Sequence, residues 1–321
     1  MPVWSTDALP PADRFAYWRE VRAKHLFGVS AELEADRRAG FRGIFSAEPL
    51  GAATLVEMHA SPYSVRRTDE DISRAPGNSV CIYQQLGGAA WFGTGRRTEF
   101  TVPAGAVATS HTDLPYATRP TTEAGFHLRV LKIPFTICTP FVQRDGDLSP
   151  QPVDGERRQS TLLSASFPAF LGQARSMSDV EVNAAVMALA QVALAVRGLL
   201  PVSDDALRLA VRQLRLIQAR DLIGQNFWRV DLTPARIAAM LGISVRQLHL
   251  LFEPTGTSVA RHLTMLRLSH AKALLAEASV RPISAVAFAS GFDSLATFYR
   301  VFRANFGMAP MEYRHAVVAA E

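Results

Sequence analysis

The chain is poor in cysteine. Cys81 and Cys138 are the only two cysteines among its 321 residues, which is too few for a disulfide framework or an all-cysteine metal site. A reduced cysteine behaves in a protein core as a small apolar residue. We therefore expect both side chains to be buried and to take no part in chemistry.

Long hydrophobic runs and targeting signals are also lacking. No run approaches 18 apolar residues, and the first residues, Met1–Asp7, do not combine a basic stretch with an apolar one. Apolar residues make up 48% of the chain and charged residues 20%, as in soluble globular proteins. These features predict a cytoplasmic protein without a membrane partner.

The sequence lacks the side-chain clusters expected of an enzyme. A metal-dependent cupin enzyme needs His-x-His, a carboxylate and a further histidine, whereas His59, His111 and His127 stand alone. Gly93-Thr94-Gly95 does not continue into a phosphate-binding pattern, and no catalytic triad can be argued from spacing. The acidic run Asp69-Glu70-Asp71 is expected to be a solvated turn. We predict no catalytic residue, metal or cofactor; a cupin-type small-molecule-modifying enzyme with an accessory helical domain remains the weaker alternative.

Charge is distributed unevenly along the chain. Residues 206–321 carry 14 lysines and arginines against 7 acidic residues, whereas residues 1–205 carry 20 against 22. The length suggests two domains, each large enough for its own core. A basic C-terminal part beside a near-neutral N-terminal part is typical of a DNA-binding domain joined to a sensing or assembly domain.

Two C-terminal stretches, residues 232–252 and 282–303, share one pattern. Each predicts a short amphipathic helix, a glycine, a few linking residues and a second helix with polar side chains. In the first, Ala238 is expected at a close helix crossing, Gly242 at a reversal with positive φ, and Ser244 at the N-cap of the second helix. Such a pair is a helix-turn-helix, whose second helix enters the DNA major groove.

The second stretch repeats this logic with Ala287, Gly291 and Ser294. Its first clear buried position, Phe298, lies seven residues after the glycine, whereas Leu248 of the first stretch lies six after Gly242. The pattern therefore predicts a second turn that is one residue longer. Residues 257–278 between the stretches predict one long helix, capped by Ser258 and about 30 Å long. Since one turn of DNA is about 34 Å, this helix could place two reading helices in successive major grooves.

Residues 207–315 resemble the tandem helix-turn-helix domain of the AraC/XylS family of bacterial transcription regulators. The residues that carry the resemblance are Ile237–Ser244, Leu251-Phe252, Thr255-Gly256, Leu266–Leu268 with Ala271, Gly291–Ser294, Phe298–Phe302, Phe306–Pro310 and Tyr313-Arg314. The resemblance implies a sequence-specific regulator, expected here to be an activator, with double-stranded promoter DNA and RNA polymerase as partners. The residues themselves leave activation or repression open.

Positions on the two reading helices select the candidate DNA contacts, which are Arg246, Gln247, His249, Ser294, Leu295, Thr297, Tyr299, Arg300 and Arg303. Arginine can bond guanine in a bidentate manner, and Gln247 could read adenine or bind a phosphate. Leu295 could contact a thymine methyl group. Arg303 and Arg267 are expected at phosphates or on the surface.

The N-terminal part predicts an α+β domain spanning residues 1–200. A helix over residues 12–27 is followed, over about 41–140, by short alternating or β-branched segments cut by glycine and proline. These indicate an antiparallel β-barrel or sandwich, and we expect the barrel. This part resembles the AraC-binding-like, cupin-type sensor domain. The residues that carry this resemblance are Phe15–Glu20, Ala60–Thr68, Val102–Ala106 and Asp113–Tyr116. The resemblance implies a barrel that could hold a small-molecule effector, with Tyr83, Trp91, His111 and Tyr116 as candidate lining residues.

Residues 161–200 predict apolar helices that need a partner surface. They could cover the barrel or pair with a second copy of the chain, and the family resemblance favours a homodimer contact. Pro201 and the small polar and acidic residues after it predict a linker over residues 201–206. The DNA-binding domain is then expected over residues 207–321.

Overall fold

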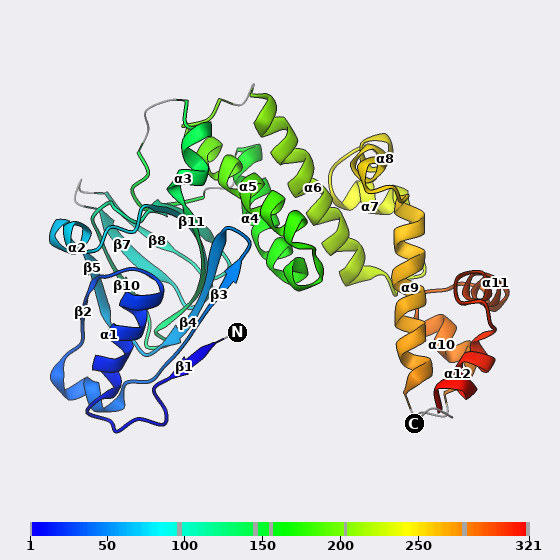
Figure 1. The fold of residues 1–321 in the computed structure, drawn as a ribbon, viewed down its shortest axis with the longest axis horizontal. Helices are drawn as coiled ribbons and strands as arrows, with labels where there is room; N and C mark the ends of the chain where they lie inside the picture. The colour runs from blue at the N-terminus through cyan, green and yellow to red at the C-terminus, as the bar shows by residue number, and fades with distance from the viewer. Residues whose placement is uncertain are drawn as a thin grey trace. The chain divides into compact units, whose positions relative to one another are not determined.

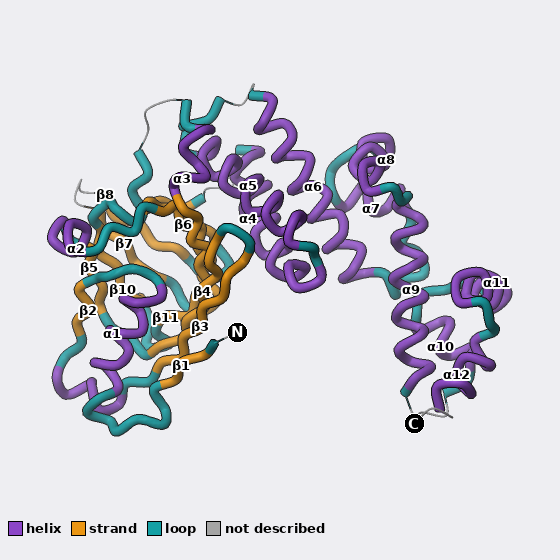
Figure 2. Tube along the Cα trace, viewed as in Figure 1, coloured by secondary structure: helices purple, strands orange, loops and turns teal. Residues whose placement is uncertain are grey.

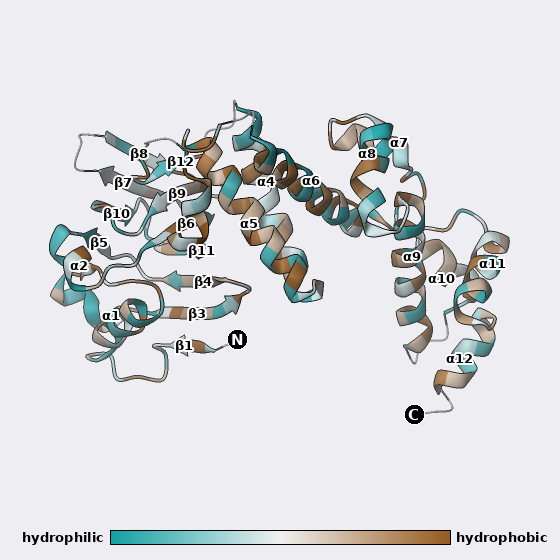
Figure 3. Ribbon diagram, turned by 45° about the horizontal axis from the view of Figure 1, so that its top comes forward, coloured by the Kyte–Doolittle hydropathy of each residue, from teal (hydrophilic) through white to brown (hydrophobic). Residues whose placement is uncertain are grey.

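The structure is a computed structural model that describes residues 2–94, 98–143, 147–153, 157–201, 204–277 and 281–318. It divides into two compact units, one ending at Leu214 and the other beginning at Arg215. The strands belong to the first unit, and the described part of the second is helical (Figure 2). The boundary falls inside α6 (Asp205–Asn226), along which hydrophobic and hydrophilic residues alternate (Figure 3). The predicted linker contains the start of α6; its residues Val202 and Ser203 lie outside the described residues.

The first unit contains two antiparallel sheets (Figure 1). The larger has the order β1-β3-β4-β11-β6-β9-β12 and the smaller β2-β5-β10-β7-β8. The strands are β1 (Val3–Ser5), β2 (Ser30–Glu32), β3 (Gly43–Leu50), β4 (Ala53–Ala60), β5 (Ser64–Arg67), β6 (Ser79–Gly87), β7 (Ala90–Thr94), β8 (Thr98–Val102), β9 (Val107–His111), β10 (Tyr116–Pro120), β11 (Phe126–Pro134) and β12 (Gln151–Pro152). The antiparallel prediction is confirmed.

The predicted closed barrel is wrong. No strand pairing joins the two sheets anywhere in the described ranges, so each sheet keeps two edges. An alternating pattern of apolar and polar residues identifies strands with one buried face. It does not show which strands pair, and therefore does not show whether the edge strands meet to close a barrel. The sequence predicts turns at Gly87-Gly88 and at residues 103–105, and each segment joins consecutive strands of different sheets, β6 to β7 and β8 to β9. Gly87-Gly88 is therefore not the hairpin turn that its glycines predict. The third predicted turn, at residues 93–95, includes Gly95, which lies outside the described residues.

Helix α1 (Arg14–His25) turns its apolar stripe inward. Phe15, Trp18 and Val21 are buried in the core formed with β3, β4 and β11. A Cβ atom at Gly43 in β3 would lie 2.6 Å from the Trp18 ring, so glycine at this position allows the indole to lie against the strand. The prediction of a helix packed on the strands is therefore confirmed.

A buried arginine joins the loops at one end of the sheets. The Arg67 side chain donates from Nε to Thr112 O (3.0 Å), from Nη1 to Asp71 O (3.1 Å) and from Nη2 to Ala75 O (2.9 Å). It also pairs with Asp113 at 3.2 Å and bonds Gly28 O. All three guanidinium nitrogens are therefore engaged within the protein.

The run at residues 69–71 begins α2 (Asp69–Arg74) and is not a solvated turn as predicted. Thr68 and Asp71 form a capping box, with Asp71 N donating to Thr68 Oγ1 (3.1 Å) and Thr68 N to Asp71 Oδ2 (3.0 Å). The same carboxylate accepts from Ser30 N at 3.1 Å, which connects α2 to β2. A threonine three residues before an aspartate, as Thr68 stands before Asp71, is the sequence feature that distinguishes such a helix start from a turn.

Replacing Asp71 with asparagine should lower the free energy of unfolding by about 2 kcal/mol at neutral pH, because a charged acceptor of several hydrogen bonds is lost. Burial acts to raise the pKa of Asp71, but the hydrogen bonds from Thr68 and Ser30 outweigh it and the pKa is lowered. The contribution is therefore present above the unfolded-state pKa of about 3.9 and is lost as pH falls through the lower folded value. Denaturant unfolding of both proteins from about pH 7 to about pH 3 should show the difference shrinking. A constant difference would contradict this role.

Helices α3 (Phe135–Cys138), α4 (Arg158–Gln173) and α5 (Asp179–Val196) complete the unit. By length and hydropathy α5 could cross a membrane, but 61% of its apolar window is buried inside the protein, as in the core helix of a globular domain. Asn183 of α5 accepts a hydrogen bond from Ala52 N (2.8 Å) in the turn between β3 and β4. Most of the predicted apolar stripe is thus covered within one chain, while Val180 and Met187 are exposed.

Candidate nucleic-acid interface and ligand cavity

The first motif consists of α7 (Pro234–Met240) and α8 (Val245–Phe252). Gly242 between them has φ +63°, and Ile243 N donates to Ala238 O (3.0 Å), which closes a tight reversal. Ser244 then starts α8 with a capping box, its Oγ accepting from Gln247 N at 3.1 Å. The predicted roles of Gly242 and Ser244 are confirmed by these contacts, and Ala238 is buried in the core of this motif.

The polar side chains of α8 face away from the core. Leu248 and Phe252 are buried, whereas Arg246, Gln247 and His249 are exposed. The Gln247 side-chain oxygen accepts from Ser244 N at 3.0 Å. A bidentate adenine contact needs that oxygen, so in this conformation Gln247 has its NH2 group left to donate to a phosphate or to a base acceptor.

The second motif consists of α10 (Ile283–Ala289) and α11 (Leu295–Phe306). Five residues link these helices and four link α7 to α8, so the predicted longer second turn is confirmed. Ser294 caps α11, its Oγ accepting from Thr297 N at 3.4 Å. Phe298 and Phe302 are fully buried. Of the DNA contacts predicted in this motif, Ser294 and Thr297 are half-buried. The others are exposed on α11: Leu295, Tyr299, Arg300 and Arg303.

Helix α9 (Val259–Ala276) takes part in both hydrophobic cores of the second unit. Ser258 caps it as predicted, its Oγ accepting from Arg261 N at 3.2 Å. At 1.5 Å per residue its 18 residues span about 27 Å. The predicted helix continued to Ala278, which lies outside the described residues.

Arg267 of α9, which the sequence predicts at a phosphate or on the surface, is half-buried and bonds the backbone of another segment. Its Nε donates to Phe227 O and its Nη2 to Arg229 O, both at 2.8 Å. Gly291, with φ +86°, lies against the same loop, since a Cβ there would be 2.5 Å from Phe227 O. The loop after α6, the middle of α9 and the second turn therefore meet at one junction, which we call the Arg267 junction.

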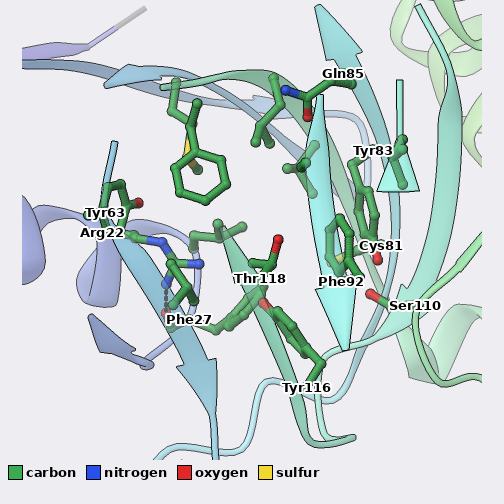
Figure 4. A pocket seen from close by; sticks show the side chains of 18 residues that line it. Arg22, Phe27, Tyr63, Cys81, Tyr83, Gln85, Phe92, Ser110, Tyr116 and Thr118 are labelled. Carbon is green, nitrogen blue, oxygen red and sulfur yellow. Dashed lines mark hydrogen bonds between the residues drawn. The ribbon is translucent and has the colours of Figure 1, made fainter. Parts of the chain in front are cut away.

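A cavity opens among α1 and the strands of the first unit (Figure 4). The space open to the centres of water-sized molecules is about 60 Å³, and all the space between the lining atoms, open solvent included, is about 630 Å³. Tyr83 and Tyr116, two of the four predicted effector contacts, line it. The complete lining is Arg22, Leu26, Phe27, Met58, Tyr63, Val65, Cys81, Tyr83, Gln85, Ala90, Phe92, Val102, Ser110, Tyr116, Thr118, Phe126, Leu128 and Val130.

The other two predicted contacts, Trp91 and His111, do not line the cavity. Ala90 and Phe92 face it from β7, and because successive strand residues point to opposite faces, Trp91 points away. Its ring lies 5.1 Å from the Arg119 guanidinium, and its Nε1 donates to Glu99 (3.3 Å). His111 follows the cavity residue Ser110 in β9, and its Nδ1 accepts from Asp113 N at 3.1 Å.

Both cysteines are buried, as predicted. Burial raises the pKa of Cys81 to about 12 and that of Cys138 to about 11, so both thiols are protonated at neutral pH. Within the described residues no group of three or more His, Cys, Asp or Glu side chains is placed to hold a metal ion.

Arg22 is the cavity residue that sequence reasoning missed. It lies on α1 with 5% of its surface exposed, one turn after Trp18 on the helix stripe that packs inward. A basic residue within an otherwise apolar stripe was the signal in the sequence. Arg22 shares the helical spacing of Phe15, Trp18 and Val21 and is buried with them, but it was not among the predicted effector contacts.

Comparisons with known proteins bear on the second unit. Residues 237–316 match a family model described as a helix-turn-helix domain. The transcriptional activator NphR of Rhodococcus is 34% identical over 99 residues, which are 31% of this chain and 29% of that protein. The transcriptional activator RhrA of Rhizobium meliloti is 32% identical over 107 residues, 33% of this chain and 34% of that protein. A solved structure of a probable AraC family regulator from Rhodopseudomonas palustris is 30% identical, with a TM-score of 0.30, and the match covers 32% of this chain and 96% of that one.

Two capped helix-turn-helix motifs, each with an exposed polar second helix, are the arrangement with which a DNA-binding domain enters the major groove. With the match of residues 237–316 to a helix-turn-helix domain and the similarity to two transcriptional activators, this part of the chain resembles the DNA-binding part of AraC/XylS regulators. It spans about a third of the length of the curated relatives that it matches. The similarity therefore concerns the helix-turn-helix part of the chain.

Proposed function

We propose that the protein is an effector-responsive transcription activator that binds promoter DNA through α8 and α11. The exposed polar faces of these two helices, each fixed by a serine cap and a buried apolar face, carry the proposal. Helix α9 is about 27 Å long, and one turn of DNA is about 34 Å. A helix of this length between the two motifs suits the placement of α8 and α11 in successive major grooves. The description of the two curated relatives as transcriptional activators supports activation, with RNA polymerase as a further partner.

The first unit supplies the sensing part of this proposal. Strands of both sheets line the cavity, and we propose that a ligand binds there among Tyr83, Tyr116 and their neighbours. A ligand shifts a conformational equilibrium only if it binds one state more tightly than the other. We propose that the effector favours the state that binds promoter DNA productively, and that the regulator acts in the cytoplasm as a homodimer.

The matches in the second unit favour a regulator over the alternative, a cupin-type enzyme with an accessory helical domain. Regulation is tested first by DNA selection. The full chain is used to select from a random duplex library, and the selected duplex is then titrated at about 50 to 200 mM salt.

We expect binding to the selected duplex to exceed binding to its shuffled version by at least about a thousandfold, and log affinity to fall linearly with log salt. The preference for the selected duplex follows from base contacts, and the salt dependence follows from phosphate contacts. Binding that is equally strong to the shuffled duplex would contradict sequence-specific regulation, and the absence of salt-sensitive binding would contradict DNA binding altogether.

A further inference from the structure

The cavity contains a buried positive charge that is largely uncompensated. The Arg22 side chain reaches from α1 into the cavity beside Phe27 and Tyr63 (Figure 4). Its Nη1 donates to Phe27 O at 3.3 Å, and its Nε, although buried, has no hydrogen-bond partner. Among the described residues no carboxylate forms an ion pair with Arg22, and no aspartate or glutamate lines the cavity.

The comparison with Arg67 shows what is unusual about Arg22. Both arginines are buried and both lie over the Phe27 ring, at 5.4 Å from guanidinium carbon to ring centroid. Every guanidinium nitrogen of Arg67 donates to a backbone oxygen, and Asp113 balances its charge. Burial of an ionised group without such partners opposes folding. The bonds of Arg67 satisfy its whole guanidinium group. The Arg22 side chain bonds Phe27 O and Tyr116, but its buried Nε is left for a molecule in the cavity.

The other polar groups around the cavity are neutral at physiological pH. Burial raises the pKa of Tyr83 and that of Tyr116, the latter in spite of the opposing positive charge of Arg22. The Cys81 thiol also remains protonated. Arg22 is therefore the one charged side chain among the residues that line the cavity.

The rest of the lining suits a planar apolar body. Phe92 lies nearly parallel to Tyr83, with ring centroids 5.9 Å apart and planes at 10°, and 6.1 Å from the Tyr116 ring. Apolar side chains including Leu26, Met58 and Val130 make up most of the remaining wall. Aromatic and aliphatic walls with a few fixed polar groups are typical of sites for small ligands.

We propose that the effector is a small aromatic carboxylic acid, whose carboxylate pairs with the Arg22 guanidinium and whose ring packs among Phe92, Tyr83 and Tyr116. A planar guanidinium matches a carboxylate through two parallel hydrogen bonds. This inference rests on the proposed sensing role of the first unit and specifies its ligand.

The test compares charged ligands with neutral ones of the same shape. Benzoate, phenylacetate and 3-phenylpropionate, each beside its primary amide, are titrated into the full chain by calorimetry, with acetate as the control for the carboxylate alone. We expect at least one carboxylate to bind at least tenfold more tightly than its amide and more tightly than acetate. Amides that bind as tightly as the acids would overturn the proposal, and so would a panel in which no acid binds.

Variants of Arg22 assign the effect to this side chain. Arg22→Met should reduce binding of the acid at least tenfold and leave the unliganded melting temperature unchanged or higher, because an uncompensated charge is removed. Arg22→Lys keeps the charge but not the planar fork, and should give intermediate affinity. The matched control Arg67→Met should lower the melting temperature, because it leaves several backbone oxygens without donors. Undiminished acid binding by both Arg22 variants would overturn the assignment.

Titration of the selected DNA duplex with the same samples separates the two proposals. If the acids do not bind while DNA binding is intact, the ligand class fails and the regulator stands. If DNA binding itself is absent, the proposed function fails, whatever the cavity binds.

Discussion

Replacing Arg246 and Arg300 together with alanine should weaken specific DNA binding by about 2–6 kcal/mol, which is about 30-fold to more than 10,000-fold. Each arginine is exposed on a different reading helix, one on α8 and one on α11. A bidentate arginine–guanine contact contributes about 1–3 kcal/mol of discrimination, and contacts at separated base pairs add roughly independently. Each single variant should therefore relax specificity at its own base pair. Titration of the selected duplex and of its single-base variants measures both effects.

The control for this experiment removes the same charge elsewhere. Arg42 and Arg74 lie in the first unit, each with about 70% of its side chain exposed. Arg42→Ala/Arg74→Ala lowers the net charge by the same amount without touching either reading helix. We expect its binding to stay within about twofold of the wild type, since neither arginine belongs to the helix-turn-helix motifs and exposed charges are screened by salt. Equal losses in the two double variants would mean that only net charge matters and would refute the assignment to α8 and α11.

Gly291→Ala should destabilise the second helix-turn-helix by about 3 kcal/mol. A left-handed backbone conformation costs an alanine about 1–2 kcal/mol, and φ at Gly291 is +86°. In addition, the new Cβ would lie 2.5 Å from Phe227 O and 3.0 Å from Trp228 C. These are backbone atoms of the Arg267 junction and cannot rotate aside, so overpacking should add about 1–3 kcal/mol.

The first motif provides the matched comparison for this prediction. Gly242 also has positive φ, at +63°, but no heavy atom lies within 4 Å of a Cβ built there. Gly242→Ala should therefore cost only the backbone term of about 1–2 kcal/mol. Native-state hydrogen exchange of the full chain reports the two motifs separately. We expect amides of α11 to lose more protection in Gly291→Ala than amides of α8 lose in Gly242→Ala. Equal losses of amide protection in the two variants would show that the close approach of Gly291 to Phe227 O does not contribute to the destabilisation.

The local pattern of the second unit was readable because its contacts are close in sequence. A capping serine, a glycine that reverses the chain and an apolar residue every three or four positions all act within one or two helical turns. The one-residue difference between the two turns was visible in the spacing from Gly242 to Leu248 and from Gly291 to Phe298. The Arg267 junction was not visible, because Arg267 and Phe227 are 40 positions apart.

The cavity was only half predicted for the same reason. Aromatic residues in strand segments are natural candidates for a lining, but whether one faces inward depends on strand register. Tyr83 and Tyr116 face the cavity, whereas Trp91 lies one residue out of phase with Phe92. The spacing of Arg22 with Phe15, Trp18 and Val21 was visible in the sequence, but only the packing of α1 against the strands shows that its side chain enters the cavity.

The sequence by itself determined the antiparallel strands, the two helix-turn-helix units, their caps and turns, and the exposed side chains offered to DNA, because all of these follow from interactions between near neighbours. The tertiary structure alone decided that the strands form two unclosed sheets, that Arg267 and Gly291 meet the loop after α6, and that a single charged side chain enters the cavity. Those outcomes depend on which distant segments share a core, and the free energy of packing them is not contained in any local pattern.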